Sequence, residues 1–174
     1  IESYISPKAT PLTRANAWKS MELISGHLRR AVADGRDEAA REAMAWGSLL
    51  AGLSFANAGV GGVHALAYPL GGAYHVPHGV SNALLLAPVM EFSAPARPDL
   101  FADIARALGV KPEGKSPEQL AQEAVRAMQS LADDVGIPRH MRDVGVPKEA
   151  IEPMAQAAIQ IERLLVNNAR PMTL

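Results

Sequence analysis

The segment from residue 59 to residue 79, GVGGVHALAYPLGGAYHVPHG, is the most unusual part of the sequence. It holds six of the fourteen glycines and three of the five histidines of the chain. Its many apolar residues argue against a solvated linker, and its glycines permit turns and a close approach of the backbone. We therefore expect a buried, irregular segment in which the glycines serve turning and helix packing.

The sequence before this segment has the periodicity of α-helices. A first helix is expected to begin at Thr10 and Pro11 and to end at Gly35. Apolar residues at intervals of three or four should form one buried stripe on it: Trp18, Met21, Ile24, Leu28 and Val32. A second helix is expected from Asp37 to about Ala58. Its apolar residues lie all round its circumference, which predicts a central, well-buried helix.

The sequence after the segment is also helical. We expect helices over residues 80–92, where Pro88 kinks or ends the helix, and 98–108, closed by Gly109. Ser116 and Gln119 form a capping-box pattern that begins a helix running to about residue 135. A last helix lies between residues 147 and 166, with Pro153 inside it. No segment shows the alternation of a β-strand, so the prediction is one all-α, multi-helix domain over residues 1–174.

Composition excludes several classes of function. The net charge of −1 gives no electrostatic footprint for nucleic acid or for an anionic membrane. The longest apolar run, from Ala83 to Met90, is too short to cross a bilayer and contains Pro88. The absence of cysteine excludes disulfides and thiolate metal sites. We expect a cytoplasmic protein, and the first residue, which is not Met, suggests that a preceding segment is missing.

His64 and His78 are the candidate metal ligands. Imidazole is the usual nitrogen ligand of Zn²⁺ and Fe²⁺, and such ligands need a rigid frame. A spacing of fourteen residues matches no pair on one helical turn, so core histidines satisfied by hydrogen bonds are an open alternative. His75 is expected to line a cleft or to be exposed. His27, late in the first helix, and His140, beside two arginines, are expected to be unrelated to a metal.

A family resemblance adds to this pattern. Residues 62–72, GVHALAYPLGG, and residues 76–79, VPHG, followed by Asn82 and Ala83, resemble the signature of iron-containing (group III) alcohol dehydrogenases. That signature has the form G-x-x-H-x-x-A-x-P-L-G followed by P-H-G-x-x-N-A. Residues 1–4, 51–59 and 168–171 also resemble family sequence. The resemblance covers essentially the whole chain and corresponds to the family's C-terminal helical domain, which is like that of dehydroquinate synthase.

The resemblance implies a function and its cofactors. In the family, an N-terminal α/β domain binds NAD(P), and the helical domain holds Fe²⁺ or Zn²⁺ with one Asp and three His. His64 and His78 match two of those three His. The metal acts as a Lewis acid on the alcohol oxygen, and hydride passes between an alcohol and the nicotinamide, or back to an aldehyde or ketone. The implied partners are a small alcohol or aldehyde and the chain's own nucleotide-binding domain.

Two departures from the family limit what this chain can do alone. The other two family ligands form an Asp-x-x-x-His pair immediately upstream of a stretch like that from Ile1 to Tyr4. Two His leave a four-coordinate ion half-ligated, so we expect the fragment to bind little metal and to be inactive. Tyr68 occupies a position where many relatives have a proton-relaying His. A phenol is a poorer relay at neutral pH, and a packed aromatic is the alternative interpretation.

Two rival functions and the oligomeric state remain open at this point. The chain could belong to an enzyme of the same fold that uses another metal or none, such as a glycerol dehydrogenase-like or maleylacetate reductase-like enzyme. It could instead be a stand-alone helical binding or scaffold module without catalysis. Apolar faces left exposed by a missing domain could also make it a homo-oligomer. Gly59, Gly61 and Gly62 are not read as a phosphate loop, because no Lys-Ser/Thr pair follows them.

Overall fold

The fold is built from helices and loops. The computed structural model describes residues 1–173, and this part of the chain contains no strand. The α-helices are α1 (Glu2–Ile5), α2 (Pro11–Ala33), α3 (Glu38–Ala58), α4 (Gly62–Tyr74), α5 (His78–Ser93), α6 (Pro98–Ala107), α7 (Pro117–Asp134), α8 (Ile151–Ile159) and α9 (Glu162–Leu165). Three short 3₁₀ helices are η1 (Ala94–Ala96), η2 (Met141–Val144) and η3 (Lys148–Ala150). The all-α prediction is confirmed.

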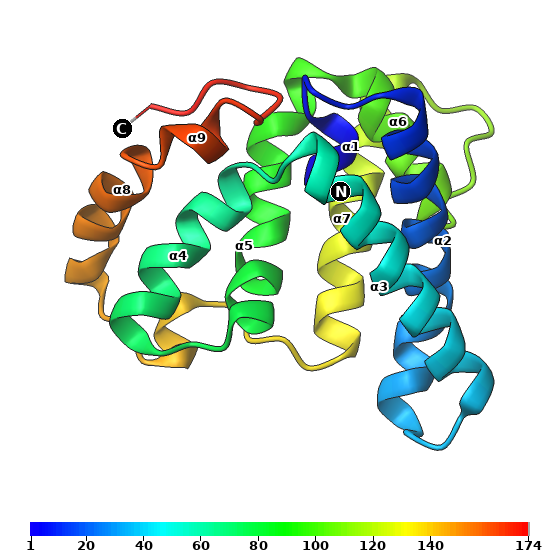
Figure 1. Cartoon of the computed structure of the whole chain (residues 1–174), viewed down its shortest axis with the longest axis horizontal. Helices are drawn as coiled ribbons and strands as arrows, with labels where there is room; N and C mark the ends of the chain where they lie inside the picture. Colours follow the sequence, from blue (N-terminus) through cyan, green and yellow to red (C-terminus); the bar gives the residue numbers. More distant parts are fainter. Residues whose placement is uncertain (174) are drawn as a thin grey trace.

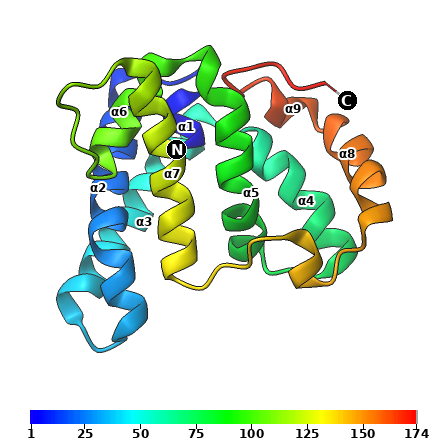
Figure 2. The same ribbon diagram turned by 180° about the vertical axis from the view of Figure 1, so that it is seen from behind.

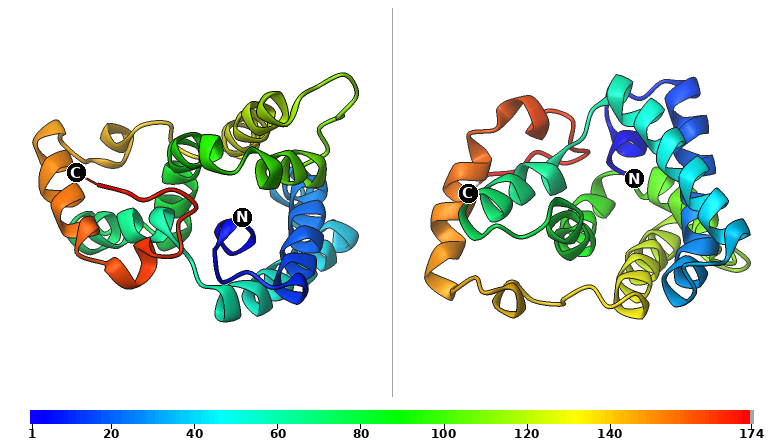
Figure 3. Two further views of the ribbon diagram at one scale, coloured as in Figure 1. Left: turned by 90° about the horizontal axis from the view of Figure 1, so that it is seen from above. Right: turned by 60° about the horizontal axis from the view of Figure 1, so that its bottom comes forward.

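The helices form two groups joined through α5. In Figure 1 the long hairpin of α2 and α3 lies on one side together with α6 and α7, and α4, α8 and α9 lie on the other. Figure 2 shows α5 running between α7 and α4, and α5 contacts both of them. The short helix α1 sits near the middle, where it packs on α2, α3 and α6 (Figure 3). The first residues of the chain are therefore central to the fold.

Small residues join α2 to α3. The buried positions of α3 are Ala40, Ala43, Gly47, Ser54 and Ala58. A Cβ at Gly47 would lie 2.7 Å from a side-chain carbon of Ile24 on α2. The hydroxyl of Ser20 donates a 2.7 Å hydrogen bond to the backbone oxygen of Gly47. Small side chains let the two helix backbones approach closely.

The prediction that α3 is a central, well-buried helix is wrong. Its large apolar side chains are about half exposed: Trp46 (53%), Leu49 (52%), Leu53 (49%) and Phe55 (48%). The reason is that the small residues of α3 make its contact with α2, so the large ones point the other way. Sequence periodicity could not reveal this, because apolar residues occur on every face of the helix.

The expected buried stripe on α2 is only partly buried. Met21 is 5% exposed, whereas Val32, at the far end, is 57% exposed. Trp18, Ile24 and Leu28 are intermediate. The stripe lines a partly open cavity with Met21, Ile24, Leu28 and Val32, so it does not pack against other side chains along its whole length.

The ends of the helices follow the sequence signals. Thr10 caps α2 and Ser116 caps α7, each in a capping box, and the Asp37 side chain accepts a hydrogen bond from Ala40 N–H. Gly109, after α6, and Gly136, after α7, have positive φ angles of 86° and 78°.

Both prolines, Pro88 and Pro153, lie inside helices. Pro88 lies inside α5 and does not end it, because the helix continues to Ser93. Pro153 is in the first turn of α8, where a missing N–H costs little. The last predicted helix is divided in two, α8 and α9, with a break near Gln160 and Ile161.

Residues 59–79 are more regular than expected. Residues 62–74 form α4, with Pro69 inside it, so the expectation of an irregular segment is wrong for most of its length. Burial explains the difference: Val63, Ala65, Ala67 and Leu70 are at most 2% exposed, and this packing overrides the low helix propensity of Gly and Pro.

The turn before α4 does depend on glycine. Gly59 ends α3 with φ 78°, and a Cβ there would lie 2.6 Å from the Asn167 side-chain nitrogen. That nitrogen donates a 2.9 Å hydrogen bond to the backbone oxygen of Val60. The turn redirects the chain, so that α3 and α4 meet at 104°. No single helix within residues 1–173 is long and apolar enough to cross a bilayer, and only α3 and α4 counted together reach that length and hydropathy.

Replacing Phe101 tests the main core. Phe101 on α6 is fully buried in the cluster formed by α1, α2, α5, α6 and α7. We expect Phe101→Ala to lower the free energy of unfolding by about 3–5 kcal/mol, because it removes a large buried ring and leaves a cavity. Urea denaturation followed by circular dichroism measures this. Leu12→Ala is the control: Leu12 is 72% exposed, so its loss should change stability by less than roughly 0.5 kcal/mol.

Replacing Gly59 tests the turn that leads into α4. Gly59→Ala should cost about 1–3 kcal/mol, because an L side chain is strained at this φ angle and its Cβ collides with Asn167. Gly52→Ala is the matched control, since Gly52 lies in α3 with open space around its Cα. It should leave stability unchanged or raise it by roughly 0.5–1 kcal/mol. Equal thermal denaturation midpoints for the two variants would contradict this account of the turn.

Candidate metal centre

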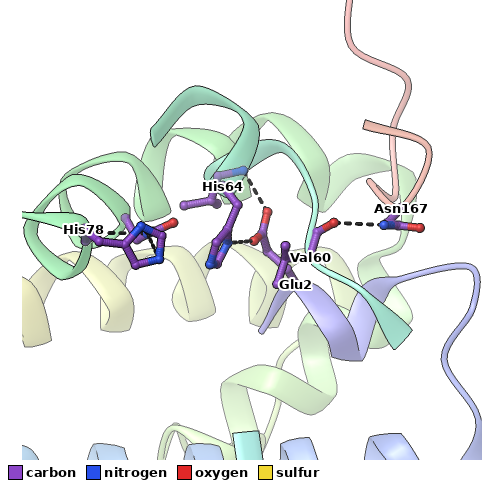
Figure 4. A network of polar contacts seen from close by, with 7 residues as sticks. Glu2, Val60, His64, His78 and Asn167 are labelled. Carbon is purple, nitrogen blue, oxygen red and sulfur yellow. Dashed lines mark hydrogen bonds and ion pairs between the residues drawn. The ribbon is translucent and has the colours of Figure 1, made fainter. Parts of the chain in front are cut away.

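The fold brings His64 and His78 side by side. His64 lies in the first turn of α4, and His78 is the first residue of α5. The centroids of their rings are 5.3 Å apart, and the ring planes are inclined by 57°. Figure 4 shows the two rings adjacent to each other. Two imidazoles separated by fourteen residues in sequence thus form one local cluster, held by two helices.

A buried carboxylate fixes His64. Glu2, on α1, is 7% exposed. Its Oε2 lies 2.5 Å from Nδ1 of His64, and its Oε1 accepts a 2.7 Å hydrogen bond from the backbone N–H of Val63. In Figure 4 the His64 ring lies between Glu2 and His78. Because a carboxylate only accepts hydrogen bonds, Nδ1 carries the hydrogen, and Nε2 is the nitrogen available to a cation.

Sequence reasoning did not identify Glu2 as a functional residue. It appeared only within the stretch Ile1-Glu2-Ser3-Tyr4, which resembles family sequence. The one available signal was an acidic residue within a stretch that resembles family sequence. Because Glu2 and His64 are 62 residues apart in sequence, their contact depends on the tertiary structure.

Polar contacts hold α1, and therefore Glu2, in place. Ser3 and Ser54 share a 2.8 Å hydrogen bond between their hydroxyls, and the hydroxyl of Ser6 donates to the Ala58 backbone oxygen at 2.6 Å. The Tyr4 hydroxyl donates to Asp103 at 3.1 Å. Burial, and then the negative charge of Asp103, raise the pKa of Tyr4 to about 12, so it remains a hydrogen-bond donor at neutral pH.

His78 is held less tightly than His64. It is exposed, and its polar neighbour is Asn82, one turn later on α5. The Asn82 side-chain nitrogen donates to the His78 backbone oxygen at 2.9 Å and lies 3.1 Å from Nε2 of the ring. The side-chain oxygen of Asn82 is buried and has no hydrogen-bond partner within the described residues. The two imidazoles therefore differ in their partners: the Glu2 carboxylate orients His64, and the Asn82 amide lies beside His78.

A cavity of about 540 Å³ adjoins this cluster. Glu2, His64 and Asn82 are among its few polar lining residues, and His78 is not part of its lining. The rest of the wall is mainly apolar and comes from α2, α5 and α7, including the stripe on α2 described above. His64 therefore lies at the edge of a largely apolar cleft that is partly open to solvent.

The other residues considered from sequence lie outside the cluster. His75 is exposed, which is one of the two alternatives expected for it, and it caps the end of α4 with a φ angle of 54°. His140 is exposed and pairs with Asp143, and Nδ1 of His27 bonds the Leu23 backbone oxygen. Tyr68 is 40% exposed, with the Arg163 guanidinium 5.8 Å from its ring centroid. A proton-relay role for Tyr68 stays a prediction.

The donor set suits half of a metal site. Two imidazoles are good ligands for Zn²⁺ or Fe²⁺, and one of them already has a carboxylate partner on its far nitrogen. Within residues 1–173, however, no three His, Cys, Asp or Glu side chains come together to hold an ion. A complete tetrahedral site would need further ligands from outside this part of the chain.

Comparison with known proteins gives a consistent result. The chain is 50% identical over 159 residues to the lactaldehyde reductase of Escherichia coli (strain K12), covering 91% of this chain and 41% of that protein. It is 46% identical over 160 residues to the 1,3-propanediol dehydrogenase of Citrobacter freundii, covering 92% and 41%. A crystal structure of 1,3-propanediol oxidoreductase matches with a TM-score of 0.96 and 44% identity, over 98% of this chain and 44% of that one.

These matches place the chain within one family and one part of it. The chain spans less than half the length of the curated relatives it matches. The model of the Fe-containing alcohol dehydrogenase family, C-terminal, matches residues 1–174. The expected resemblance is confirmed, and the chain belongs to the Fe-containing alcohol dehydrogenase family, of which it represents the C-terminal, all-helical part.

Proposed function

We propose that this chain is the metal-binding half of an NAD(P)-dependent alcohol dehydrogenase. The reaction is hydride transfer between a small alcohol and the nicotinamide, or the reverse reduction of an aldehyde or ketone. The observation that supports this most is the pair of adjacent imidazoles, with the His64 Nδ1 bonded to Glu2 and its Nε2 available. Relatives named as a lactaldehyde reductase and a 1,3-propanediol dehydrogenase support the same class of reaction.

His64 and His78 would hold the metal through ring nitrogens. The bound Fe²⁺ or Zn²⁺ would supply Lewis-acid polarisation of the substrate oxygen. The protein's own part is to fix the two imidazoles: α4 and α5 set their separation, and Glu2 sets the orientation of one ring. The mainly apolar cleft beside His64 leaves few polar groups to compete for that side of the ring.

The rest of the enzyme would supply what this chain lacks. Relatives are more than twice as long as the matched segment, so we propose that an additional domain binds NAD(P) and that further ligands complete the metal site. The stand-alone binding module is the rival proposal. It predicts that the protein has no bound metal and no NAD(P)-linked turnover. The cytoplasmic location and the possible homo-oligomer stay predictions.

Replacing either histidine with alanine tests the metal site in the full-length protein. His64→Ala and His78→Ala should each abolish bound metal and lower kcat/KM by more than 100-fold, because changes to the partners of ligands alone commonly cost 10- to 100-fold. Elemental analysis of purified protein measures the metal, and alcohol-dependent reduction of NAD(P) measures turnover.

His140→Ala is the matched control. It removes an imidazole that is exposed and paired with Asp143, outside the cluster, so metal content and turnover should equal those of the wild type. Full metal content in either His64→Ala or His78→Ala would show that these residues are not ligands. A wild-type enzyme that is active without any bound metal would instead favour a same-fold enzyme of the metal-independent kind.

The isolated chain should be inactive. It provides two of the donors for a four-coordinate ion and no nucleotide-binding domain of the kind proposed above, so we expect no NAD(P)-linked oxidation of alcohols by pure residues 1–174. A spectrophotometric assay with ethanol and 1,3-propanediol checks this. Addition of the separately produced upstream domain should restore measurable turnover, whereas turnover by the isolated chain would overturn the two-part proposal.

A further inference from the structure

Glu2 is placed to do more than join two segments of the fold. A buried carboxylate is costly unless hydrogen bonds or an opposite charge compensate it. Here both oxygens are used: one by the Val63 backbone N–H and the other by Nδ1 of His64. Val63 is the second residue of α4, so the carboxylate also satisfies one of the free N–H groups at the start of that helix.

The same carboxylate therefore fixes the His64 ring relative to the backbone of its own helix. The ring of a histidine on a helix can rotate about two side-chain bonds. With Nδ1 bonded to Glu2, and Glu2 bonded to Val63 beside it, that rotation is restricted to one orientation. Nε2 then lies on the side of the ring away from Glu2, next to His78 (Figure 4).

We propose that Glu2 is a positioning residue for the metal. It selects the His64 tautomer with hydrogen on Nδ1, directs Nε2 to the cation, and makes that nitrogen a stronger donor through its negative charge. This inference rests on the proposed metal site and deepens it. It states that Glu2 contributes to the affinity for the metal although it does not touch the metal. The hydrogen bonds of Ser3 and Ser6 matter here because they hold α1 rigid.

The test compares Glu2→Gln with Glu123→Gln in the full-length, metal-free protein. Gln has the shape of Glu but a single oxygen acceptor, so Val63 N–H and His64 Nδ1–H can no longer both be satisfied. We expect the dissociation constants for Zn²⁺ and for Fe²⁺, the latter measured anaerobically, to rise about 10- to 100-fold. Glu123→Gln makes the same change at a glutamate of α7 that pairs with Arg126, outside the cluster, and should leave both constants unchanged.

A measurement on the wild type keeps the inference testable if Glu2→Gln fails to fold. In metal-free protein labelled with ¹⁵N-histidine, the ring nitrogen shifts should show hydrogen on Nδ1 of His64. Hydrogen on Nε2 there, or unchanged metal affinity in Glu2→Gln, would overturn the role of Glu2. If His64→Ala and His78→Ala lose the metal while Glu2→Gln keeps full affinity, only this inference fails. If the two histidine variants keep the metal, the proposed function fails.

Discussion

The contact between the Glu2 carboxylate and the start of α4 is the interaction on which the candidate site depends. It joins the first turn of the chain to a helix that begins 60 residues later, and it satisfies a helix N–H and an imidazole at once. The frame around it consists of α1, α3 and α6, linked by the serine and tyrosine hydrogen bonds. Loss of the His64 partner within an intact frame would leave a buried negative charge short of a hydrogen bond, which costs far more than the loss of an ordinary surface contact.

The site lies at the junction of the two groups of helices. α4 contacts α8 and α9 on one side, whereas α5 reaches α7 on the other, and the two candidate ligands come from the beginnings of α4 and α5. Glycines serve the frame around the site in two places. Gly47 lets α2 and α3 approach closely, and Gly59 turns the chain between α3 and α4. The arrangement leaves a mainly apolar cavity beside His64.

Much of the architecture could be predicted from local patterns. The caps at Thr10, Asp37 and Ser116 and the positive φ angles of Gly109 and Gly136 arise from interactions within a few residues, so the sequence reveals them directly. The exposed face of α3 and the helical form of residues 62–74 were predicted wrongly. Both depend on which neighbour a helix packs against, and packing overrides the propensities of glycine, proline and large apolar residues.

The residues by themselves determined the all-helical class, the candidate ligands His64 and His78 and, through the motif around them, the family. Only the tertiary structure decided that the two rings are neighbours, that Glu2 is bonded to His64 and that the face of α2 lines a cavity. The physical reason is that side-chain type and helical period are local properties. A contact between groups 14 or 62 residues apart, by contrast, exists only after the helices have packed and fixed their separation.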